Sequence, residues 1–166
     1  MNIRLAERDL ATQYGVFREI LYYDGQRESI ALVMGDVAGK DDVLCRVHSH
    51  CIGAHVFNSV ECTCREEMAA AQAMVQQARE GVIIWLDQEG KGNGHLALIE
   101  SIKYKKEVGQ ADAYVRAGFK ADARDYRPAA EILADLDVRS IRLISNSNAK
   151  ADDLRKSSIV VSGLAS

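Results

Sequence analysis

Proline, aromatic residues and long hydrophobic runs are scarce in this chain. Only one of the 166 residues is proline, Pro128, and aromatic residues contribute 6%. The apolar run 81–86 is far shorter than the about 20 residues that a membrane-spanning helix needs. Residues 1–8 also lack the apolar core of a signal peptide. We therefore expect one domain over residues 1–166, a cytoplasmic location and no membrane partner.

An excess of positive charge is missing as well. The formal net charge is −3, from 21 lysine and arginine residues against 24 aspartate and glutamate residues. A nucleic-acid-binding domain normally carries a strongly basic surface. The charge balance therefore argues against nucleic acid as a partner, while it leaves room for a small basic pocket that binds a phosphorylated small molecule.

Internal repeats are absent, and strands alternate with helices along the chain. Helices are expected over 66–80, with Gly81 ending the first, and over 96–107 and 128–135. Strands are expected over 13–23, 30–34, 43–47, 82–86, 138–145 and 159–161. This order predicts the α/β class, with a layered mixed sheet and flanking helices. In such folds, ligands gather in the loops beyond the strand ends.

Three of the four cysteines are closely spaced in the sequence. Ten residues separate Cys51 from Cys62, and one separates Cys62 from Cys64. In a reducing cytoplasm such cysteines are thiols or metal ligands rather than disulfides. A catalytic zinc site keeps three protein ligands and one open position for water. The spacing therefore predicts one zinc ion held by the three sulfurs.

Two other interpretations of these cysteines stay open. They are either ordinary buried thiols, or they belong to a closed structural zinc site with His48, His50 or His55 as the fourth ligand. The remaining cysteine, Cys45, lies within an apolar strand and is expected to be a small core residue.

The same residues carry a family resemblance. The segment Arg46-Val47-His48-Ser49 before Cys51, together with Cys62-x-Cys64, resembles GTP cyclohydrolase II of riboflavin biosynthesis. Three later segments are similar to that family in the same order, so the match covers roughly residues 12 to 161. They are Asp87-Gln88-Glu89-Gly90-Lys91, Gly118-Phe119-Lys120-Ala121-Asp122-Ala123-Arg124-Asp125-Tyr126, and the strand end 141–146 with Lys150.

The resemblance implies a hydrolase that works with zinc. The family opens the imidazole ring of GTP and releases formate and pyrophosphate, with zinc carrying the attacking water and Mg²⁺ assisting at the phosphates. By position, Asp122 would accept a proton, Arg124 would attack the α-phosphate, and Tyr104 would lie near the ring. The zinc ligands would be Cys51, Cys62 and Cys64.

Further positions are implied to bind the small-molecule substrate, and the family resemblance implies a homodimer. The implied substrate-binding residues are Arg46, Val47, His48, Ser49, His50, Glu67, Glu89, Gly90, Lys91, Ser145 and Lys150. These residue types suit the chemistry, because a carboxylate can shuttle protons and arginine or lysine can bind phosphate oxygens.

Several of these positions depart from the family pattern. His50 replaces a glutamate, Glu67 a glutamine, Lys91 an arginine and Ser145 a threonine, and the stretch 109–118 is two residues shorter. An exchanged donor or acceptor in a polar pocket can change selectivity by orders of magnitude. Three hypotheses follow: a cyclohydrolase acting on GTP or a related purine nucleotide, a hydrolase of another N-heterocycle, and a catalytically silent, zinc-containing nucleotide-binding protein.

Overall fold

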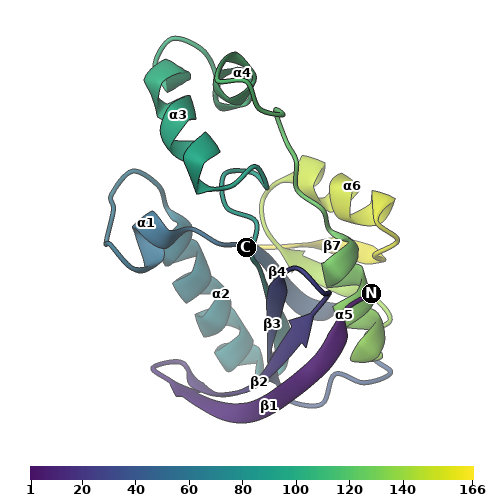
Figure 1. Cartoon of the computed structure of the whole chain (residues 1–166). Helices are drawn as coiled ribbons and strands as arrows, with labels where there is room; N and C mark the ends of the chain where they lie inside the picture. The colour runs from purple at the N-terminus through teal and green to yellow at the C-terminus, as the bar shows by residue number, and fades with distance from the viewer. The chain divides into compact units, whose positions relative to one another are not determined.

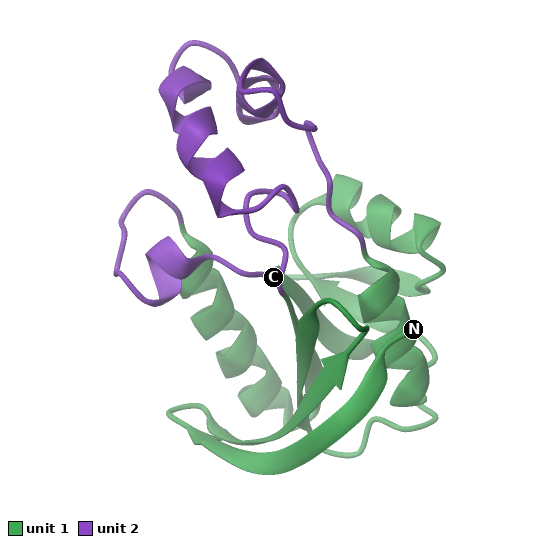
Figure 2. Ribbon diagram, viewed as in Figure 1, with its two compact units in different colours: residues 1–48, 63–86, 126–166 green, residues 49–62, 87–125 purple.

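The computed structural model describes all 166 residues, which form two compact units (Figure 2). Unit 1 comprises residues 1–48, 63–86 and 126–166, and unit 2 comprises residues 49–62 and 87–125. No helix in either unit is long and apolar enough to cross a lipid bilayer. That residues 1–166 act as a single domain stays a prediction.

Unit 1 is built on a seven-stranded sheet with the strand order β1-β2-β3-β5-β4-β6-β7. The pairs β1–β2, β2–β3 and β3–β5 are antiparallel, whereas β4–β6 and β6–β7 are parallel. The mixed sheet and its flanking helices confirm the predicted α/β class. The strands are β1 (Ile3–Thr12), β2 (Gly15–Tyr23), β3 (Glu28–Met34), β4 (Val43–Ser49), β5 (Gly81–Leu86), β6 (Ile141–Ile144) and β7 (Val161–Ala165).

Three helices cover the two faces of this sheet, with α2 on one face and α5 and α6 on the other (Figure 1). Alternate residues of β5 divide between the two faces, as the strand geometry requires. Ile83 packs with Val75 of α2, while Val82 and Ile84 join the core shared with α5 and α6. Burial on both faces explains the continuous apolar run in β5. The helices are α2 (Cys64–Ala78), α5 (Arg127–Asp135) and α6 (Asn148–Lys156).

Leu143 provides a test of the larger core. Its side chain in β6 is fully buried and packs in the core shared with α5 and α6. Leu143→Ala is expected to lower the free energy of unfolding by about 2–5 kcal/mol, because it removes apolar contacts and leaves a cavity. Urea unfolding followed by circular dichroism measures this change. Val160→Ala, at a position that is 62% exposed, is the control and should change stability by less than about 0.5 kcal/mol. Equal losses in both variants would contradict the assigned core.

Unit 2 contains three helices joined by irregular segments. α1 (Ile52–His55) is a single turn, and α3 (His95–Lys105) packs against α4 (Gln110–Arg116). Residues 87–94 form a glycine-rich turn before α3, and residues 118–125 follow α4. These two irregular segments carry the family-like sequences, so unit 2 holds most of the polar motifs.

Some predicted element boundaries are wrong. The helix predicted over 66–80 begins at Cys64 and ends at Ala78, and its left-handed C-terminal residue is Arg79 (φ 58°) rather than Gly81. Gly81 begins β5 instead, where a Cβ would lie 2.7 Å from the side chain of Val75. Three strand predictions are corrected as well: the strand predicted over 13–23 begins at 15, that over 138–145 is confined to 141–144, and that at 159–161 lies at 161–165.

The sequence does not predict β1, α1, α4 or α6. β1 is exposed along nearly its whole length, so its residues show no alternation of apolar and polar side chains. α1 and α4 are only four and seven residues long. α6 buries only Ala151 and Leu154, which is too narrow an apolar face to stand out in the sequence.

Candidate active site

Cys51, Cys62 and Cys64 bring their sulfur atoms together. The Sγ atoms of Cys51 and Cys62 lie 3.6 Å apart, and all three sulfurs lie within 4.8 Å of one another. Cys51 directly precedes α1, and Cys64 is the first residue of α2. Sulfurs placed tetrahedrally around zinc at about 2.3 Å are about 3.8 Å apart. The donor atoms and their spacing therefore fit a zinc ion.

No histidine belongs to this group of potential metal ligands. His48 is 2% exposed, and its Nδ1 accepts a hydrogen bond from Nε of Arg46 at 3.3 Å. Nε2 of His50 lies 3.6 Å from Oε2 of Glu89, and His55 is the last residue of α1. The three cysteine sulfurs are therefore the potential metal ligands that the structure brings together.

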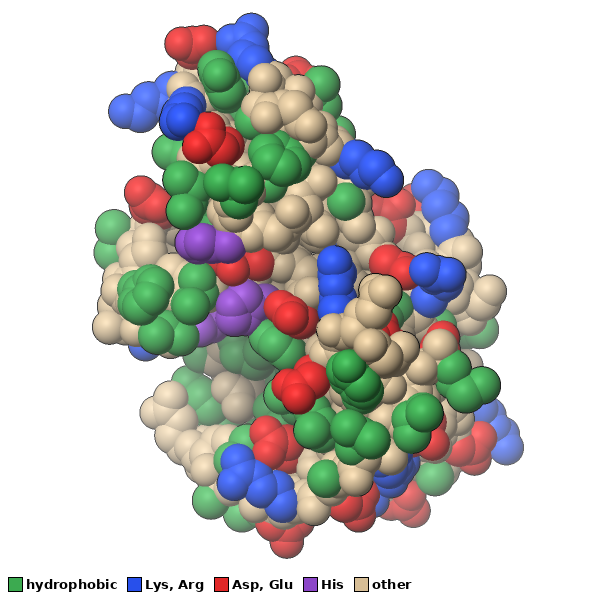
Figure 3. Space-filling view, viewed as in Figure 1, with side chains coloured by type: hydrophobic (Ala, Val, Ile, Leu, Met, Phe, Trp, Pro, Cys, Tyr) green, Lys and Arg blue, Asp and Glu red, His purple; other side chains and the backbone are tan.

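Glu89 lies at the centre of a polar cluster in unit 2. Its side chain is 9% exposed, and its Oε1 accepts a hydrogen bond from the backbone N–H of Ile52 at 3.3 Å and lies 2.9 Å from Nδ1 of His95. Its Oε2 faces His50. Figure 3 shows histidine side chains close to an acidic side chain on one face of the molecule. Glu89 thus connects Ile52, the residue after Cys51, with His95, the first residue of α3.

The turn formed by residues 87–94 has an unusual backbone. Gly90, Lys91 and Gly92 follow one another with positive φ angles of 62°, 52° and 83°. The carbonyl oxygen of Lys91 accepts a hydrogen bond from the N–H of Ala123 at 2.8 Å. A Cβ at position 92 would lie 2.5 Å from the carbonyl oxygen of Ala123. Glycine at this position therefore allows the turn to approach the later segment closely.

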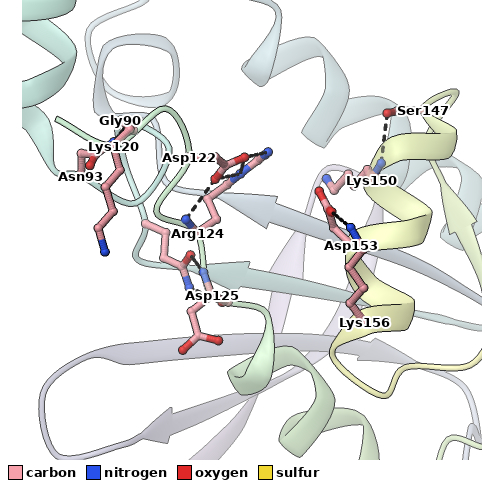
Figure 4. Close-up of polar contacts among 11 residues, drawn as sticks. Gly90, Asn93, Lys120, Asp122, Arg124, Asp125, Ser147, Lys150, Asp153 and Lys156 are labelled. Carbon is pink, nitrogen blue, oxygen red and sulfur yellow. Dashed lines mark hydrogen bonds and ion pairs between the residues drawn. The ribbon is translucent and has the colours of Figure 1, made fainter. Parts of the chain in front are cut away.

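Two side chains of this turn bind residues 120–125. Nδ2 of Asn93 donates to the carbonyl oxygen of Lys120 at 2.9 Å (Figure 4). Gln88, which is 4% exposed, exchanges two hydrogen bonds with the backbone of Asp125. The turn and the segment 120–125 therefore form one hydrogen-bonded body within unit 2.

Asp122 and Arg124 form a close ion pair (Figure 4). Oδ1 of Asp122 accepts from the backbone N–H and from Nε of Arg124, both at 3.0 Å, and Oδ2 accepts from Nη2 at 2.6 Å. Burial raises the pKa of Asp122, but the hydrogen bonds from Arg124 and the charge of Lys91 outweigh it and lower the pKa below its ordinary 3.8. The carboxylate is therefore ionised at neutral pH.

In unit 1, all three donor groups of Arg46 are engaged. Nη2 donates to Oε2 of Glu67 at 2.7 Å, Nη1 donates to the carbonyl oxygen of Ile144 at 3.1 Å, and Nε donates to His48. Oε1 of Glu67 accepts from Oγ1 of Thr63 at 3.0 Å. Glu67 stands where the resembled family has glutamine, so here a carboxylate neutralises the charge of Arg46.

Ser145 and Lys150 lie around the start of α6, also in unit 1. Nζ of Lys150 donates to the carbonyl oxygen of Val47 at 2.5 Å, and its backbone N–H donates to Oγ of Ser147 at 3.2 Å (Figure 4). Oγ of Ser145 accepts from the N–H of Ser147 at 3.1 Å. The side chain of Val47 is 1% exposed and part of the core, so only its main chain is available to a ligand. Ser49 ends β4.

Tyr104 lies toward the far end of α3. It follows His95 by nine residues, which corresponds to about 13 Å along a helix. The guanidinium carbon of Arg116 lies 5.7 Å from the centre of its ring. The structure thus joins Tyr104 to α4, and its predicted place near the substrate ring stays a prediction.

Two residues of unit 2 were missed by the sequence reasoning. His95 has no motif around it, and its pairing with Glu89 depends on the reversal of the chain between them. Gln88 lies inside a family-like segment, but only the structure shows that its side chain forms hydrogen bonds with the backbone of Asp125.

Comparison with known proteins agrees with the sequence resemblance. A model of the GTP cyclohydrolase II family matches residues 3–165. GTP cyclohydrolase-2 of Streptomyces coelicolor is 40% identical over 162 residues, which cover 95% of this chain and 73% of that protein. The riboflavin biosynthesis protein RibBA of Mycobacterium avium is 41% identical over 157 residues, which cover 89% of this chain. This chain spans 36% of the length of that relative.

A solved structure has the same fold. It is the crystal structure of RibBX, a two domain 3,4-dihydroxy-2-butanone 4-phosphate synthase from A. baumannii. The TM-score is 0.54 at 20% sequence identity, and the match covers 99% of this chain and 40% of that chain. At this identity the likeness concerns the fold alone.

Proposed function

Because this chain belongs to the GTP cyclohydrolase II family, we propose that it is a zinc-dependent hydrolase that opens the imidazole ring of GTP or a related purine nucleotide. The products would be formate, from ring carbon C8, and pyrophosphate. The observation that carries this proposal is the group of three cysteine sulfurs within 4.8 Å of one another. The ion pair of Asp122 and Arg124 supports it further.

The whole reaction consumes three water molecules, one for each of the three bonds of GTP that are broken. Hydrolysis of the C8–N9 bond opens the ring, and hydrolysis of the C8–N7 bond releases C8 as formate. Cleavage between the α- and β-phosphates releases pyrophosphate. The reaction therefore needs no oxidant or reductant, only groups that bind the nucleotide and move protons.

The residues of this chain divide these tasks. Cys51, Cys62 and Cys64 would hold the zinc ion. A zinc ion bound in this way lowers the pKa of a coordinated water toward neutrality. Asp122, which is ionised at neutral pH, would accept a proton and return it to a ring nitrogen.

Arg124 would bind the α-phosphate and attack its phosphorus, with pyrophosphate as the leaving group. Water would then hydrolyse the new bond between nitrogen and phosphorus, which releases the product monophosphate and frees Arg124. The guanidinium is protonated at neutral pH, so the attacking nitrogen must give up its proton as its bond to phosphorus forms. Asp122 already accepts hydrogen bonds from Nε and Nη2 of Arg124, so its carboxylate is placed to take that proton. By the family resemblance, Lys91 and Lys150 would also bind the substrate, through its phosphate oxygens.

A second candidate function is hydrolysis of a different N-heterocycle. Glu67 neutralises Arg46, which the resemblance assigns to substrate binding. His50, which replaces a glutamate, lies beside Glu89. These exchanges change the donors and acceptors that a ring would meet, and such exchanges can alter selectivity by orders of magnitude.

The experiment that separates these functions uses purified, zinc-loaded protein with Mg²⁺ and a panel of purine and pyrimidine nucleotides. Formate, pyrophosphate and the loss of purine absorbance are followed together. Equal amounts of formate and pyrophosphate from GTP are expected. Silence on GTP with turnover of another ring would support the second candidate. Silence on the whole panel, with one zinc ion per chain, would contradict both and support the third hypothesis, a catalytically silent, zinc-containing nucleotide-binding protein.

We further propose a cytoplasmic homodimer whose nucleotide substrate carries Mg²⁺ on its phosphates, as the family resemblance implies. Light scattering should then give twice the chain mass of 18.3 kDa. Turnover should fall when Mg²⁺ is omitted while zinc is retained. A monomeric mass or Mg²⁺-independent turnover would contradict the corresponding part of this proposal.

A further inference from the structure

Gln88 is a buried amide that bonds both backbone groups of a single residue. Its Nε2 donates to the carbonyl oxygen of Asp125 at 2.5 Å, and its Oε1 accepts from the N–H of Asp125 at 2.7 Å. The side chain is 4% exposed. A carboxamide presents one donor and one acceptor side by side, as this pairing requires. Gln88 therefore makes the same two hydrogen bonds with the backbone of Asp125 that a residue of a neighbouring strand would make.

This pairing fixes the backbone on one side of Arg124. Asp125 follows Arg124 directly, and Ala123 precedes it. The N–H of Ala123 donates to the carbonyl oxygen of Lys91 at 2.8 Å. Hydrogen bonds to the same turn thus anchor both neighbours of Arg124, which leaves its backbone little freedom to rotate.

We propose that Gln88 is a positioning residue that holds Asp122 and Arg124 in their reactive geometry. The inference rests on the proposed function, in which these two residues carry the proton and phosphate chemistry. The hydrogen bonds to Asp125 come from the side chain of Gln88, whereas the hydrogen bond to Ala123 comes from the backbone carbonyl of Lys91. Substitution of Gln88 can therefore remove the bonds to Asp125 and leave the bond to Ala123 intact.

A positioning role and a merely structural role differ in their effect on Asp122. Burial raises the pKa of this carboxyl group, while the hydrogen bonds from Arg124 lower it. Loosening the segment would weaken these hydrogen bonds and let the pKa rise toward its ordinary 3.8. A loss of stability that leaves the Asp122–Arg124 pair intact would not move this pKa.

The test uses Gln88→Met, which keeps the length of the side chain and removes both hydrogen bonds. Gln88→Glu keeps an acceptor but places a second oxygen against the carbonyl group of Asp125. With zinc-loaded protein and GTP, both variants are expected to lower kcat by about 10²-fold, the usual effect of a misplacement of about 1 Å. The KM and the zinc content should change little. Ser101→Ala is the matched control, because Ser101 is also a buried polar residue of unit 2 and donates to the carbonyl oxygen of Leu98 at 2.8 Å.

A carboxyl ¹³C NMR titration of Asp122 provides a second readout that does not depend on turnover. The pKa of Asp122 should rise in Gln88→Met and stay unchanged in Ser101→Ala. Wild-type protein that is silent on GTP would contradict the proposed function, and the titration would then decide the role of Gln88 alone. A wild-type kcat in both Gln88 variants, or an unchanged pKa of Asp122, would overturn the positioning role.

Discussion

The Cys62→Ser variant is expected to lose its bound zinc and, with it, turnover of the nucleotide. Cys62 lies in the group of sulfurs that fits the ion, and serine offers a hydroxyl that binds zinc poorly at neutral pH. The free energy of zinc binding at structural sites with four ligands is about 10–16 kcal/mol. Each ligand therefore contributes roughly 3 kcal/mol, and its loss should weaken the affinity about 10²–10³-fold. Competition with a chelating dye measures the affinity, and elemental analysis measures the zinc content.

Cys45 provides the matched control within the same chain. It is fully buried in β4, and burial raises the pKa of its thiol to about 12. Cys45→Ala should therefore keep one zinc ion per chain and lower the free energy of unfolding by about 1 kcal/mol. An unchanged zinc affinity in Cys62→Ser, or loss of zinc in Cys45→Ala, would show that the three-sulfur site is wrongly assigned.

Asp122→Asn should lower kcat by about 10²–10⁴-fold, the usual contribution of a general base. The amide can still accept a hydrogen bond from the N–H of Arg124, so the fold and the zinc content should stay as in the wild type. Arg124 would remain available to phosphate, and the KM for GTP should change less than kcat. Steady-state kinetics with zinc analysis on the same samples measures all three quantities. An active Asp122→Asn enzyme would rule out Asp122 as the proton acceptor.

The pH dependence expected from Asp122 follows from the direction of its pKa shift. Its pKa is lower in the folded protein than the ordinary value of 3.8. The stabilisation from its ionised form is therefore complete above pH 3.8 and is lost as the pH falls through the folded-state pKa. Between about pH 5 and 8, titration of Asp122 should change neither activity nor stability. An acidic limb of kcat in that range whose midpoint shifts in Asp122→Glu would contradict this assignment.

The sequence predicts those elements of the fold whose local composition decides their structure. The Ala- and Gln-rich segment of α2 and the apolar run of β5 are of this kind, and both are present within two residues of their predicted bounds. β1 escapes prediction because it is exposed on both faces and shows no alternation. The strand order cannot be predicted from local sequence either, because the position of β5 between β3 and β4 depends on contacts between residues far apart in the chain.

In the candidate site, too, the sequence predicts what depends on local spacing and does not predict what depends on the path of the chain. The spacing of the cysteines predicts that Cys51 approaches Cys62, because ten residues can easily return to a pair of ligands. The pairing of Glu89 with His95 could not be predicted, because the two residues meet through a turn that includes Lys91 in a left-handed conformation. Non-glycine residues adopt this conformation only rarely, so no sequence rule indicates it.

The position of β1 at the edge of the sheet has a consequence for self-association. An edge strand leaves a row of backbone groups open to pairing with another chain, which is the first step toward fibrous aggregates. β1 carries Arg4, Glu7, Arg8 and Asp9, and its register is irregular between Arg4 and Ala6. Charge and irregularity both discourage strand addition. β1 thus covers the edge of β2 and is itself a poor template for the addition of a strand from another chain.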